Sequence, residues 1–571
     1  MGESKSRMQL ILRTLLLCVL ALILLGCQGK HAHKGIPAKD IALPRANPAY
    51  IQWLRQQSML GWVNDLIAQV SGTERIWQNS GTEQRYPLLL RHAPTWLMID
   101  PSIAPTQTPL FSSLAQPSLL QTLKNWGIQG IFISPAWETA QIWAEPGMPT
   151  HKDAVTGFSF AKQLGDETSY AHFFKNAQAF DLQIGGSLPP AHTGIGPDFM
   201  LQTQGLPDYA GLYACVLVPQ SLWKDLPPNT QGEPQPLDAK TKELLITSGV
   251  IPQYLHKNSL PFANPSGWAL TGAIQGADGN LRRFVYCFDT HPSRPVLFWQ
   301  DPSGLAKRLY AAATIRLTGL LRQTLAALPI KALMGLDALR QGEHPSASTS
   351  HLEPGLSALG ELSQTIHRYG GWSLTTEDYP LSVLPVLLEK TDFACEYQMA
   401  TALDQAIATE DTTALQALLR QIASLPNKRL VHTLPTTNEA QALSLAIQAS
   451  LPGLLFLQNE RLPLFATKTD QNLLALLQAR KEYNLAEGTL LPPPPSPKSC
   501  LLLLNQLPNA TLWLVAANFS KKQQDLSLPP LPRGGTLLEY RSLNGGKEMT
   551  KLPSQRILSL NPRAVRHILI K

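Results

Sequence analysis

Apolar residues recur along this chain at two different spacings, and the two spacings alternate. From residue 94 to residue 135, a short run of apolar residues is followed by a segment with apolar residues three or four positions apart, and then by a second short run. Short apolar runs are typical of strands that are buried on both faces, and the longer spacing is typical of an amphipathic helix. The repeated unit predicts an α/β fold built on a buried parallel sheet.

The predicted strands share a short apolar core that is bounded by Gly, Pro or polar residues. They lie at residues 94–100, 130–135, 182–188, 330–337, 371–376, 429–434 and 453–457. The predicted helices share apolar residues at helical spacing. They lie at residues 50–70, 117–126, 170–177 and 304–328.

Two regions depart from this alternation. Residues 193–300 are rich in Pro, Gly and polar residues and lack a clear period, so we expect a long inserted loop domain on one face, where lids and substrate loops lie. Past a proline run at residues 491–497, short segments alternate between apolar and polar positions. They predict a C-terminal antiparallel β-sandwich, and we favour a packing role for it over a separate binding function.

Composition and charge narrow the function classes. The chain has 571 residues, which is enough for two or three domains, and its 44% hydrophobic and 16% charged residues are typical of a globular protein. Its formal net charge of +7 is small for this length, and no segment is dense in Lys or Arg. We therefore expect no nucleic-acid partner.

The first 27 residues have the pattern of a targeting segment. Lys5, Arg7 and Arg13 precede an apolar stretch at residues 15–25, which is too short for a comfortable membrane span and is soon followed by polar sequence. The stretch runs into the sequence Leu-Leu-Gly-Cys, which ends at Cys27. This pattern predicts export from the cytoplasm.

The Leu-Leu-Gly-Cys sequence resembles the lipobox of bacterial lipoproteins. The resemblance implies a signal peptide at residues 1–26, cleavage before Cys27 and attachment of lipid to the Cys27 thiol, with residues 27–48 as a tether to the membrane. Gln28 stands where inner-membrane lipoproteins often have aspartate, so we expect the outer membrane of the bacterial cell envelope, with the protein facing the periplasm. A cleaved signal of a soluble protein and an uncleaved anchor are the alternatives.

Four further cysteines, Cys215, Cys287, Cys395 and Cys500, lie far apart in the sequence. Their spacing is unlike that of a metal site. An exported protein could join them in disulfides, but the sequence does not give the pairing, and one disulfide with two buried free thiols is equally compatible with it. We predict no metal site and no cofactor.

A single carboxylate ends the predicted strand at residues 330–337. Asp337 follows an apolar run, and a charge at the end of a buried strand is costly unless it is paired or faces a cleft. Catalytic residues of α/β barrels lie at these carboxyl ends of the strands. The alternative is that Asp337 caps the helix that follows.

Several segments at predicted strand ends resemble, in their order, the α-amylase superfamily, glycoside hydrolase family 13, in its trehalose-synthase-like or amylosucrase-like branch. These segments are residues 125–135, 157–159, 187–193, 334–338, 374–378, 436–439 and 452–460. The resemblance runs from about residue 94 to the C-terminus and implies a (β/α)8 TIM barrel. The chain after the tether then divides into a helical segment, a barrel with its insertion, and a sandwich, at residues 49–93, 94–490 (inserted region 193–300) and 491–571.

The resemblance assigns catalytic roles to two carboxylates. Asp337 takes the position of the nucleophile, and Glu377 takes that of the acid/base glutamate. Retaining glycosidases need two such groups about 5–5.5 Å apart, one to attack the anomeric carbon and one to protonate the leaving oxygen. Gly335 replaces the arginine that orients the nucleophile, and Asn438 replaces a third carboxylate. Loss of such charged groups typically costs orders of magnitude in rate.

The resemblance also implies contacts to sugar rings. Phe158 takes the place of an aromatic platform, His192 that of a sugar-contacting histidine, and Asn438 keeps a group that can accept a hydrogen bond. A Phe in the core and a structural His are the alternatives. Ala191 replaces an asparagine that often binds calcium, so we expect no calcium there.

Two main hypotheses for the function follow, and the sequence leaves open whether the protein is an enzyme. In the first, it is a hydrolase or transglycosylase that acts on α-linked glucosides or oligosaccharides through Asp337 and Glu377. In the second, it is a catalytically inactive amylase-like envelope lipoprotein that binds a glycan or a membrane protein partner. A third alternative is a barrel that serves only as a scaffold.

Overall fold

The computed structural model describes most of the chain. The described residues are 48–70, 82–101, 108–139, 153–227, 234–251, 267–333, 352–433, 441–458, 471–529, 537–543, 546–551 and 557–570. Cys27, Asp337 and Asn438 lie outside these ranges, as does the predicted signal peptide. Within them, no helix combines the length and the apolar character that crossing a membrane requires.

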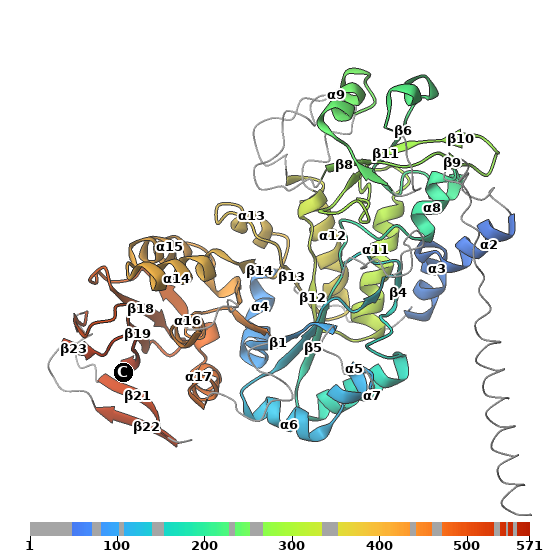
Figure 1. Ribbon diagram of the computed structural model, residues 1–571. Coiled ribbons are helices and arrows are strands. Elements are labelled where there is room, and N and C mark those ends of the chain that lie inside the picture. Colours follow the sequence, from blue (N-terminus) through green and yellow to red (C-terminus); the bar gives the residue numbers. More distant parts are fainter. Residues whose placement is uncertain are drawn as a thin grey trace, which may run out of the picture.

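Eight parallel strands close into a barrel. In chain order they are β1 (Thr95–Ile99), β2 (Gly130–Ile133), β5 (Gln183–Ser187), β12 (Leu325–Ala327), β13 (Trp372–Thr375), β14 (Phe393–Glu396), β15 (Leu430–Thr433) and β16 (Leu454–Gln458). Each strand pairs with the next one in chain order, and β16 pairs with β1 to close the ring. The predicted (β/α)8 barrel is therefore confirmed (Figure 1).

The helices of this unit alternate with the strands or cover their ends. They are α4 (Thr82–His92), α5 (Leu110–Leu114), α6 (Pro117–Asn125), α7 (Glu167–Ala179), α11 (Leu305–Ile315), α12 (Gly355–Arg368), α13 (Leu384–Leu388), α14 (Gln398–Thr409), α15 (Thr413–Ala423), α16 (Gln441–Gln448) and α17 (Gln471–Glu482). The helices predicted at residues 117–126 and 170–177 correspond to α6 and α7.

The fourth barrel strand lies earlier in the sequence than predicted, and residues 330–333, the described part of the strand predicted at residues 330–337, do not form a strand. Helix α11 continues as a π-helical turn at Arg316–Leu320, β12 follows at Leu325–Ala327, and Lys331–Leu333 is a 3-10 helix. Leu and Ala favour helices, which is why the predicted helix extends over β12. Here these side chains are fully buried in the sheet, and this tertiary context overrides the local preference.

Strand β14 was not predicted from the sequence. Its four residues, Phe-Ala-Cys-Glu, are too few to show a period, and polar residues precede them. The strand ends in Glu396, so the same signal that singled out Asp337 was present here.

Aromatic side chains fill much of the barrel interior. Trp96, Phe132, Phe393 and Phe456 are all buried in one cluster there. Gly130 on β2 faces the Trp96 indole closely, since a Cβ atom at this glycine would lie 2.3 Å from the ring. The barrel is therefore a packed core, and a ligand site is expected at the ends of its strands.

The predicted N-terminal helix is broken into two helices, α2 (Pro48–Gln57) and α3 (Met59–Val70), which meet at Ser58. The buried Asp198 carboxylate holds this break. It accepts hydrogen bonds from the Ser58 hydroxyl (2.8 Å) and from the N–H groups of the first two residues of α3 (2.9 and 3.0 Å). These are N–H groups that the start of a helix leaves without intrahelical partners.

The inserted region has more regular structure than its sequence predicts. Its elements are α8 (Pro197–Thr203), η2 (Pro207–Tyr209), β6 (Cys215–Leu217), η3 (Gln220–Asp225), β7 (Gln235–Pro236), α9 (Ala239–Thr247), β8 (Gly267–Leu270), β9 (Ile274–Gln275), β10 (Leu281–Arg282) and β11 (Phe284–Phe288). An antiparallel sheet in the order β6-β11-β8-β7 lies beyond one end of the barrel (Figure 1). A short antiparallel pair, β3 (Trp137–Glu138) and β4 (Gly157–Phe160), follows β2.

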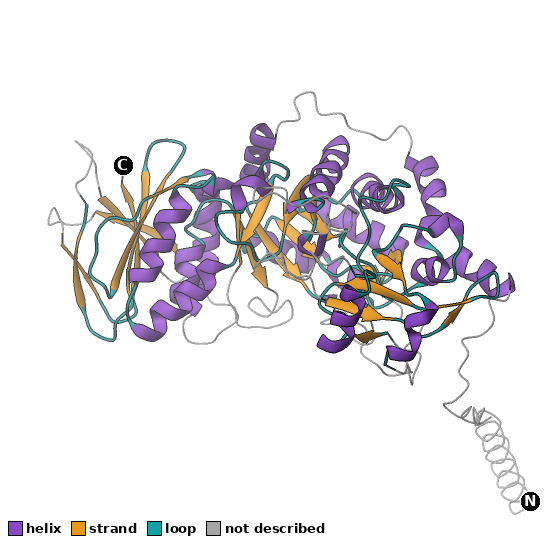
Figure 2. Cartoon of the chain, turned by 90° about the horizontal axis from the view of Figure 1, so that it is seen from above, coloured by secondary structure: helices purple, strands orange, loops and turns teal. Residues whose placement is uncertain are grey.

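The C-terminal region is a β-sandwich, as predicted. One sheet has the order β17 (Thr489–Leu491), β18 (Cys500–Gln506), β19 (Leu512–Asn518), β24 (Val565–Ile570), β21 (Leu537–Leu543) and β22 (Gly546–Lys551), and β20 (Gln524–Ser527) pairs with β23 (Ile557–Leu560). A buried apolar cluster joins the two sheets, for example Leu502 and Leu514 with Leu526 and Leu558. Both sheets lie together at one end of the molecule (Figure 2).

All four of the cysteines left open by the sequence are free in the structure: Cys215, Cys287, Cys395 and Cys500. Three of them are buried and Cys215 is half-buried. Both of the expected arrangements include at least one disulfide, and both therefore differ from this structure.

Candidate functional site

A cavity of about 410 Å³ opens at the carboxyl ends of the barrel strands, and we call it the mouth pocket. Its lining comes from the residues after β2, β5, β12 and β13 and from the inserted region. Its polar and charged members are Ser134, Asp153, Ser187, His192, Asp289, Thr290, Arg294, Lys331, Thr376, Glu377 and Asp378. The volume lies within the range of small-molecule sites. Of the predicted site residues, Glu377 and His192 are brought together here.

Glu377 follows closely after β13 and is held by three donors. Its Oε2 atom accepts hydrogen bonds from the backbone N–H groups of Ile330 and Lys331, at 2.6 Å each, and from the Tyr379 hydroxyl, at 2.7 Å. The side chain thereby ties the residues after β13 to the segment after β12. Three donors on one oxygen fix the carboxyl group in a single orientation.

Burial raises the pKa of Glu377 to about 7. The hydrogen bonds from Tyr379, Lys331 and Ile330 act in the opposite direction, and the nearby charge of Asp289 adds to the rise. A carboxyl group with this pKa is present in both protonation states near neutral pH. A general acid needs this property, and a structural carboxyl group surrounded by protein acquires it as well.

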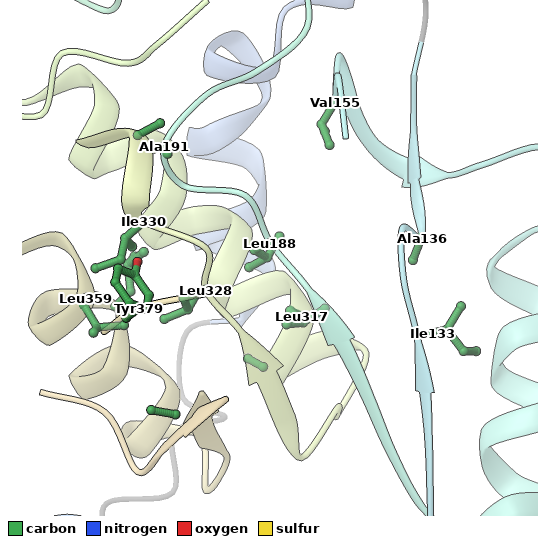
Figure 3. Packing of buried hydrophobic residues seen from close by; sticks show 14 of the residues in the cluster. Ile133, Ala136, Val155, Leu188, Ala191, Leu317, Leu328, Ile330, Leu359 and Tyr379 are labelled. Carbon is green, nitrogen blue, oxygen red and sulfur yellow. The ribbon is translucent and has the colours of Figure 1, made fainter. Parts of the chain in front are cut away.

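The chain that follows strand β12, the fourth in the barrel, borders the mouth pocket, and its described residues up to Leu333 include no carboxylate. Leu325 and Ala327 belong to the barrel interior, and Pro329, the next residue on that side, lines the pocket. Leu328 belongs instead to the buried layer outside the barrel strands, which includes Tyr379 (Figure 3). The structure does not place Asp337, which comes well after the end of β12 in the sequence.

His192 lines the mouth pocket with both ring nitrogens already next to protein acceptors. Its Nδ1 atom lies 3.0 Å from Oδ2 of Asp289, and its Nε2 atom lies 3.1 Å from the backbone oxygen of Asp153. The Tyr310 hydroxyl donates a hydrogen bond to the backbone oxygen of His192. These contacts fix the ring, as the structural alternative for this histidine requires.

Arg294 connects the same group of residues. Its guanidinium donates to the Asp289 backbone oxygen (2.9 Å) and to Oδ2 of Asp153 (3.3 Å), and it lies 3.6 Å from Oδ2 of Asp289. Asp289 and Arg294 come from the inserted region, and the sequence analysis does not find them. Asp289 directly follows β11, so a strand-end carboxylate was the signal, but the region showed no period that would have predicted the strand.

Phe158 lies apart from Glu377. Its ring is buried and contacts Trp137 and Tyr310 edge to face, at centroid distances of 5.8 and 5.9 Å, and Trp62 at 6.1 Å. This is the environment that the core alternative describes. The residue borders a second cavity, on the other side of the β3–β4 pair from the mouth pocket.

Ser187 ends β5 and takes part in a small hydrogen-bonded group at the pocket. Its hydroxyl lies 2.6 Å from that of Ser134, and its backbone oxygen accepts a hydrogen bond from the Trp137 indole N–H at 2.6 Å. These contacts fix β2, β3 and β5 relative to one another. The polar groups of Ser134, Trp137 and Ser187 thereby bind one another at the end of β5.

Glu396, at the end of the missed strand β14, is a second carboxyl group with an unusual environment. Burial raises its pKa to about 7, and its Oε1 atom accepts a hydrogen bond from the Met399 N–H at 2.9 Å. Burial also lowers the pKa of His432, whose Nδ1 atom lies 3.9 Å from Oε2 of Glu396, to about 3. The neighbouring Ala394 belongs to the layer outside the barrel strands, and Glu396 shares its side of β14, away from the mouth pocket.

Metal-ligating side chains do not cluster in the part of the chain that the structure describes, since no three His, Cys, Asp or Glu residues there could hold an ion together. Three of the charged groups of the mouth pocket contact one another as ion pairs, because Arg294 lies next to both Asp153 and Asp289. The arrangement is therefore that of a polar pocket with fixed hydrogen-bonding groups.

The sequence matches no family model and no curated protein. The fold, however, is similar to that of solved α-glucoside enzymes. An α-amylase from Geobacillus thermoleovorans, complexed with acarbose, has a TM-score of 0.54 at 12% identity, over 84% of this chain and 98% of that chain. A trehalose-6-phosphate hydrolase from Bacillus licheniformis has a TM-score of 0.56 at 10% identity, over 84% and 99%. An α-glucosyl transfer enzyme reaches 0.57 at 13% identity, again over 84% and 99%.

Proposed function

We propose that the mouth pocket binds an α-linked glucoside and that the protein does not hydrolyse it. The observation that carries this proposal is the clamp on Glu377: the segment after β12 presents Pro329 to the pocket and uses the N–H groups of Ile330 and Lys331 to bind Oε2 of Glu377. In a retaining glycosidase, a second carboxylate lies about 5–5.5 Å from the acid. Among the residues that the structure describes, hydrogen-bond donors and no second carboxylate contact the Glu377 carboxyl group, which supports a binding function over catalysis.

The chemistry of the pocket supports a saccharide as the ligand. Asp153, Asp289, Arg294 and Lys331 surround a small cavity with acceptors and donors, and the Trp137 ring contributes an apolar wall. Hydroxyl groups of a sugar can both donate to the carboxylates and accept from the cations. Two of the structural neighbours are an α-amylase complexed with acarbose and an α-glucosyl transfer enzyme, which supports the α-linked class.

Calorimetric titration of the chain from residue 28 with maltotriose, trehalose and sucrose tests this proposal. We expect saturable binding of at least one of these sugars. We also expect Glu377→Gln and Lys331→Ala to weaken it about tenfold each, because each change removes a charged hydrogen-bonding group from the pocket. Glu389→Gln, a change at an exposed residue outside the pocket, is the control and should bind as wild type does. Absence of saturable binding to all three sugars would contradict the proposal.

A second candidate function is hydrolysis or transglycosylation, with Asp337 as nucleophile and Glu377 as acid/base. The pKa of about 7 for Glu377 favours it, because the acid must be protonated at the working pH. In that case wild-type protein releases glucose from one of the three sugars, the rate falls above about pH 7, and Asp337→Asn abolishes it. Such turnover would overturn the non-catalytic proposal, and its absence at every pH would remove this second candidate.

We also propose that the protein is held at the bacterial outer membrane, facing the periplasm, by lipid on Cys27. The support is the Leu-Leu-Gly-Cys sequence and the residue Gln28 that follows it. Metabolic labelling with a fatty acid, followed by membrane fractionation, tests this. Wild-type protein should incorporate label and separate with the outer membrane, whereas Cys27→Ser should lose the label. Equal labelling of both forms would contradict the anchor.

A further inference from the structure

A second and larger cavity lies outside the barrel mouth. It has a volume of about 940 Å³ and is bordered by α2, α3, the β3–β4 pair, α7 and the end of α11; we call it the N-terminal cleft. The β3–β4 pair separates the two cavities. Trp137 and Val155 line the mouth pocket, whereas Glu138, Thr156 and Phe158 line the N-terminal cleft.

Partly exposed aromatic rings line this cleft. They are Trp53 on α2, Trp62 on α3 and Phe174 on α7. Trp53 is 45% exposed, and its ring stacks on Tyr50 at a centroid distance of 5.8 Å and an interplanar angle of 14°. An indole that is supported on one side and open to solvent is a platform for a flat apolar face, such as the C–H face of a pyranose ring.

A fixed polar group lies beside the rings. The guanidinium of Arg316 donates to Oε1 of Glu167 at 2.5 Å and to the Phe158 backbone oxygen at 2.8 Å, and it lies over the Trp62 ring at 5.3 Å. The Arg316 side chain is 7% exposed, but that of Glu167 is 68% exposed. The arginine thus holds Glu167 in place as an acceptor that remains open to hydroxyl groups in the cleft.

Among the described residues, the charges that line the N-terminal cleft are balanced. Arg316 and Arg322 contribute the positive charges, and Glu138 and Glu167 contribute the negative ones. A site for a phosphate, a nucleic acid or an acidic sugar would be expected to carry a positive excess. Balanced charge next to open aromatic faces fits a neutral polyhydroxylated ligand.

We propose that the N-terminal cleft binds a neutral oligosaccharide of about two or three rings, at a site separate from the mouth pocket. Trp53 and Trp62 stack on the sugar rings, and Glu167, positioned by Arg316, accepts hydrogen bonds from their hydroxyl groups. This site does not depend on what the mouth pocket binds, because none of the described lining residues is common to the two cavities.

Titration with the neutral trisaccharides maltotriose, cellotriose and fully N-acetylated chitotriose, followed by calorimetry and by tryptophan fluorescence, tests this proposal. We expect at least one of them to bind and to change the fluorescence. Trp53→Ala should weaken this binding by about threefold to tenfold, and Trp53→Phe, which keeps an aromatic face, by less. Leu88→Ala, at another exposed apolar residue, is the control and should have no effect.

The two cavities can be told apart in the same experiment. Glu377→Gln, a change in the mouth pocket, should not alter the part of the sugar binding that Trp53→Ala weakens. If the mouth pocket binds no sugar, titration of the wild-type protein should show only the binding that Trp53→Ala weakens. Failure of the proposed function would therefore leave the test of the N-terminal cleft unaffected. Absence of binding by all three trisaccharides, or binding that Trp53→Ala leaves unchanged, would overturn the proposal.

Discussion

At the scale of single residues, two strand-end carboxyl groups have similarly raised pKa values but different hydrogen-bond partners and surroundings. Burial raises the pKa of both Glu377 and Glu396 to about 7. Glu377 has three donors on Oε2 and lines a pocket, whereas Glu396 accepts from the Met399 N–H and faces away from that pocket. The two groups therefore share a pKa, but only Glu377 can contact a ligand in the mouth pocket.

Tyr379→Phe should destabilise the protein more at pH 8 than at pH 5. The Tyr379 hydroxyl donates to Oε2 of Glu377, and a hydrogen bond to an ionised carboxylate is stronger than one to a neutral acid. Glu377 is ionised above its pKa of about 7, so we expect a loss of about 1–3 kcal/mol at pH 8 and a smaller loss at pH 5. Urea unfolding of both proteins at the two pH values measures this. An equal loss at both values would contradict the proposed charge state.

Glu396→Gln should flatten the dependence of stability on pH between about 4.5 and 7. The folded pKa of Glu396 lies above its ordinary value of 4.5, so the native state binds the proton more tightly than the unfolded chain does. The stability that this group contributes is fully present below pH 4.5 and is lost as the pH rises through 7. Thermal unfolding from pH 4 to pH 8 checks this: the Tm of wild type should fall more steeply over this interval than that of the variant. Parallel curves would show that Glu396 does not titrate there.

At the scale of elements, close packing between neighbouring strands fixes the barrel. Gly130 on β2 leaves room for the Trp96 indole on β1, and Gly185 on β5 leaves room for the Phe132 ring on β2. Strand pairing brings these residues side by side, with Trp96 opposite Gly130 and Phe132 opposite Gly185. Large rings and glycines thus alternate across three adjacent strands, and neither type could be exchanged without repacking the interior.

Gly130→Ala should destabilise the barrel by about 1–3 kcal/mol, because the new methyl group would lie 2.3 Å from the fully buried Trp96 ring. Gly360→Ala in α12 is the matched control. Its Cβ would have a contact of 3.5 Å with the Lys390 side chain, and alanine favours the helix by up to about 1 kcal/mol. Denaturant unfolding measures both. A Gly130→Ala protein as stable as wild type would show that Trp96 can move.

At the scale of the whole molecule, the C-terminal sandwich and the barrel share one buried layer. Leu503 and Trp513 of the six-stranded sheet belong to the same apolar cluster as the outer layer of the barrel. The Trp513 indole N–H donates to the Ser450 hydroxyl at 3.2 Å, and the Asn505 amide donates to the Ser450 backbone oxygen at 3.1 Å. These contacts support the predicted packing role of the sandwich.

Trp513→Ala should therefore destabilise the barrel together with the sandwich. The side chain is fully buried, so we expect a loss of about 3–5 kcal/mol in a single cooperative transition. Ile557→Ala, at a residue of β23 that is 62% exposed, is the control and should change stability by less than about 0.5 kcal/mol. Thermal unfolding followed by helical circular dichroism, which reports on the barrel, measures both. A helical signal that Trp513→Ala leaves unchanged would show that the two units unfold independently.

The sequence by itself determined the elements whose pattern is local. Six of the eight barrel strands, helices α6 and α7, the sandwich and the strand-end position of Glu377 followed from apolar runs, helical spacing and turn residues, because burial on one or two faces leaves a period in the chain. Strand β12 was placed too late and β14 was missed, since three or four residues carry too little pattern to outweigh the helix preference of Leu and Ala or flanking polar residues.

Only the tertiary structure decided what surrounds each side chain. It brought the Ile330 and Lys331 N–H groups to Glu377, joined His192 to Asp289 across the inserted region, and placed Phe158 away from the mouth pocket. Such contacts join residues that are far apart in the chain, and neither residue of a pair produces a periodic pattern in the sequence around it. The sequence thus predicted that Glu377 lies at the end of a barrel strand. Its hydrogen-bond partners, which determine its chemistry, depend on long-range contacts.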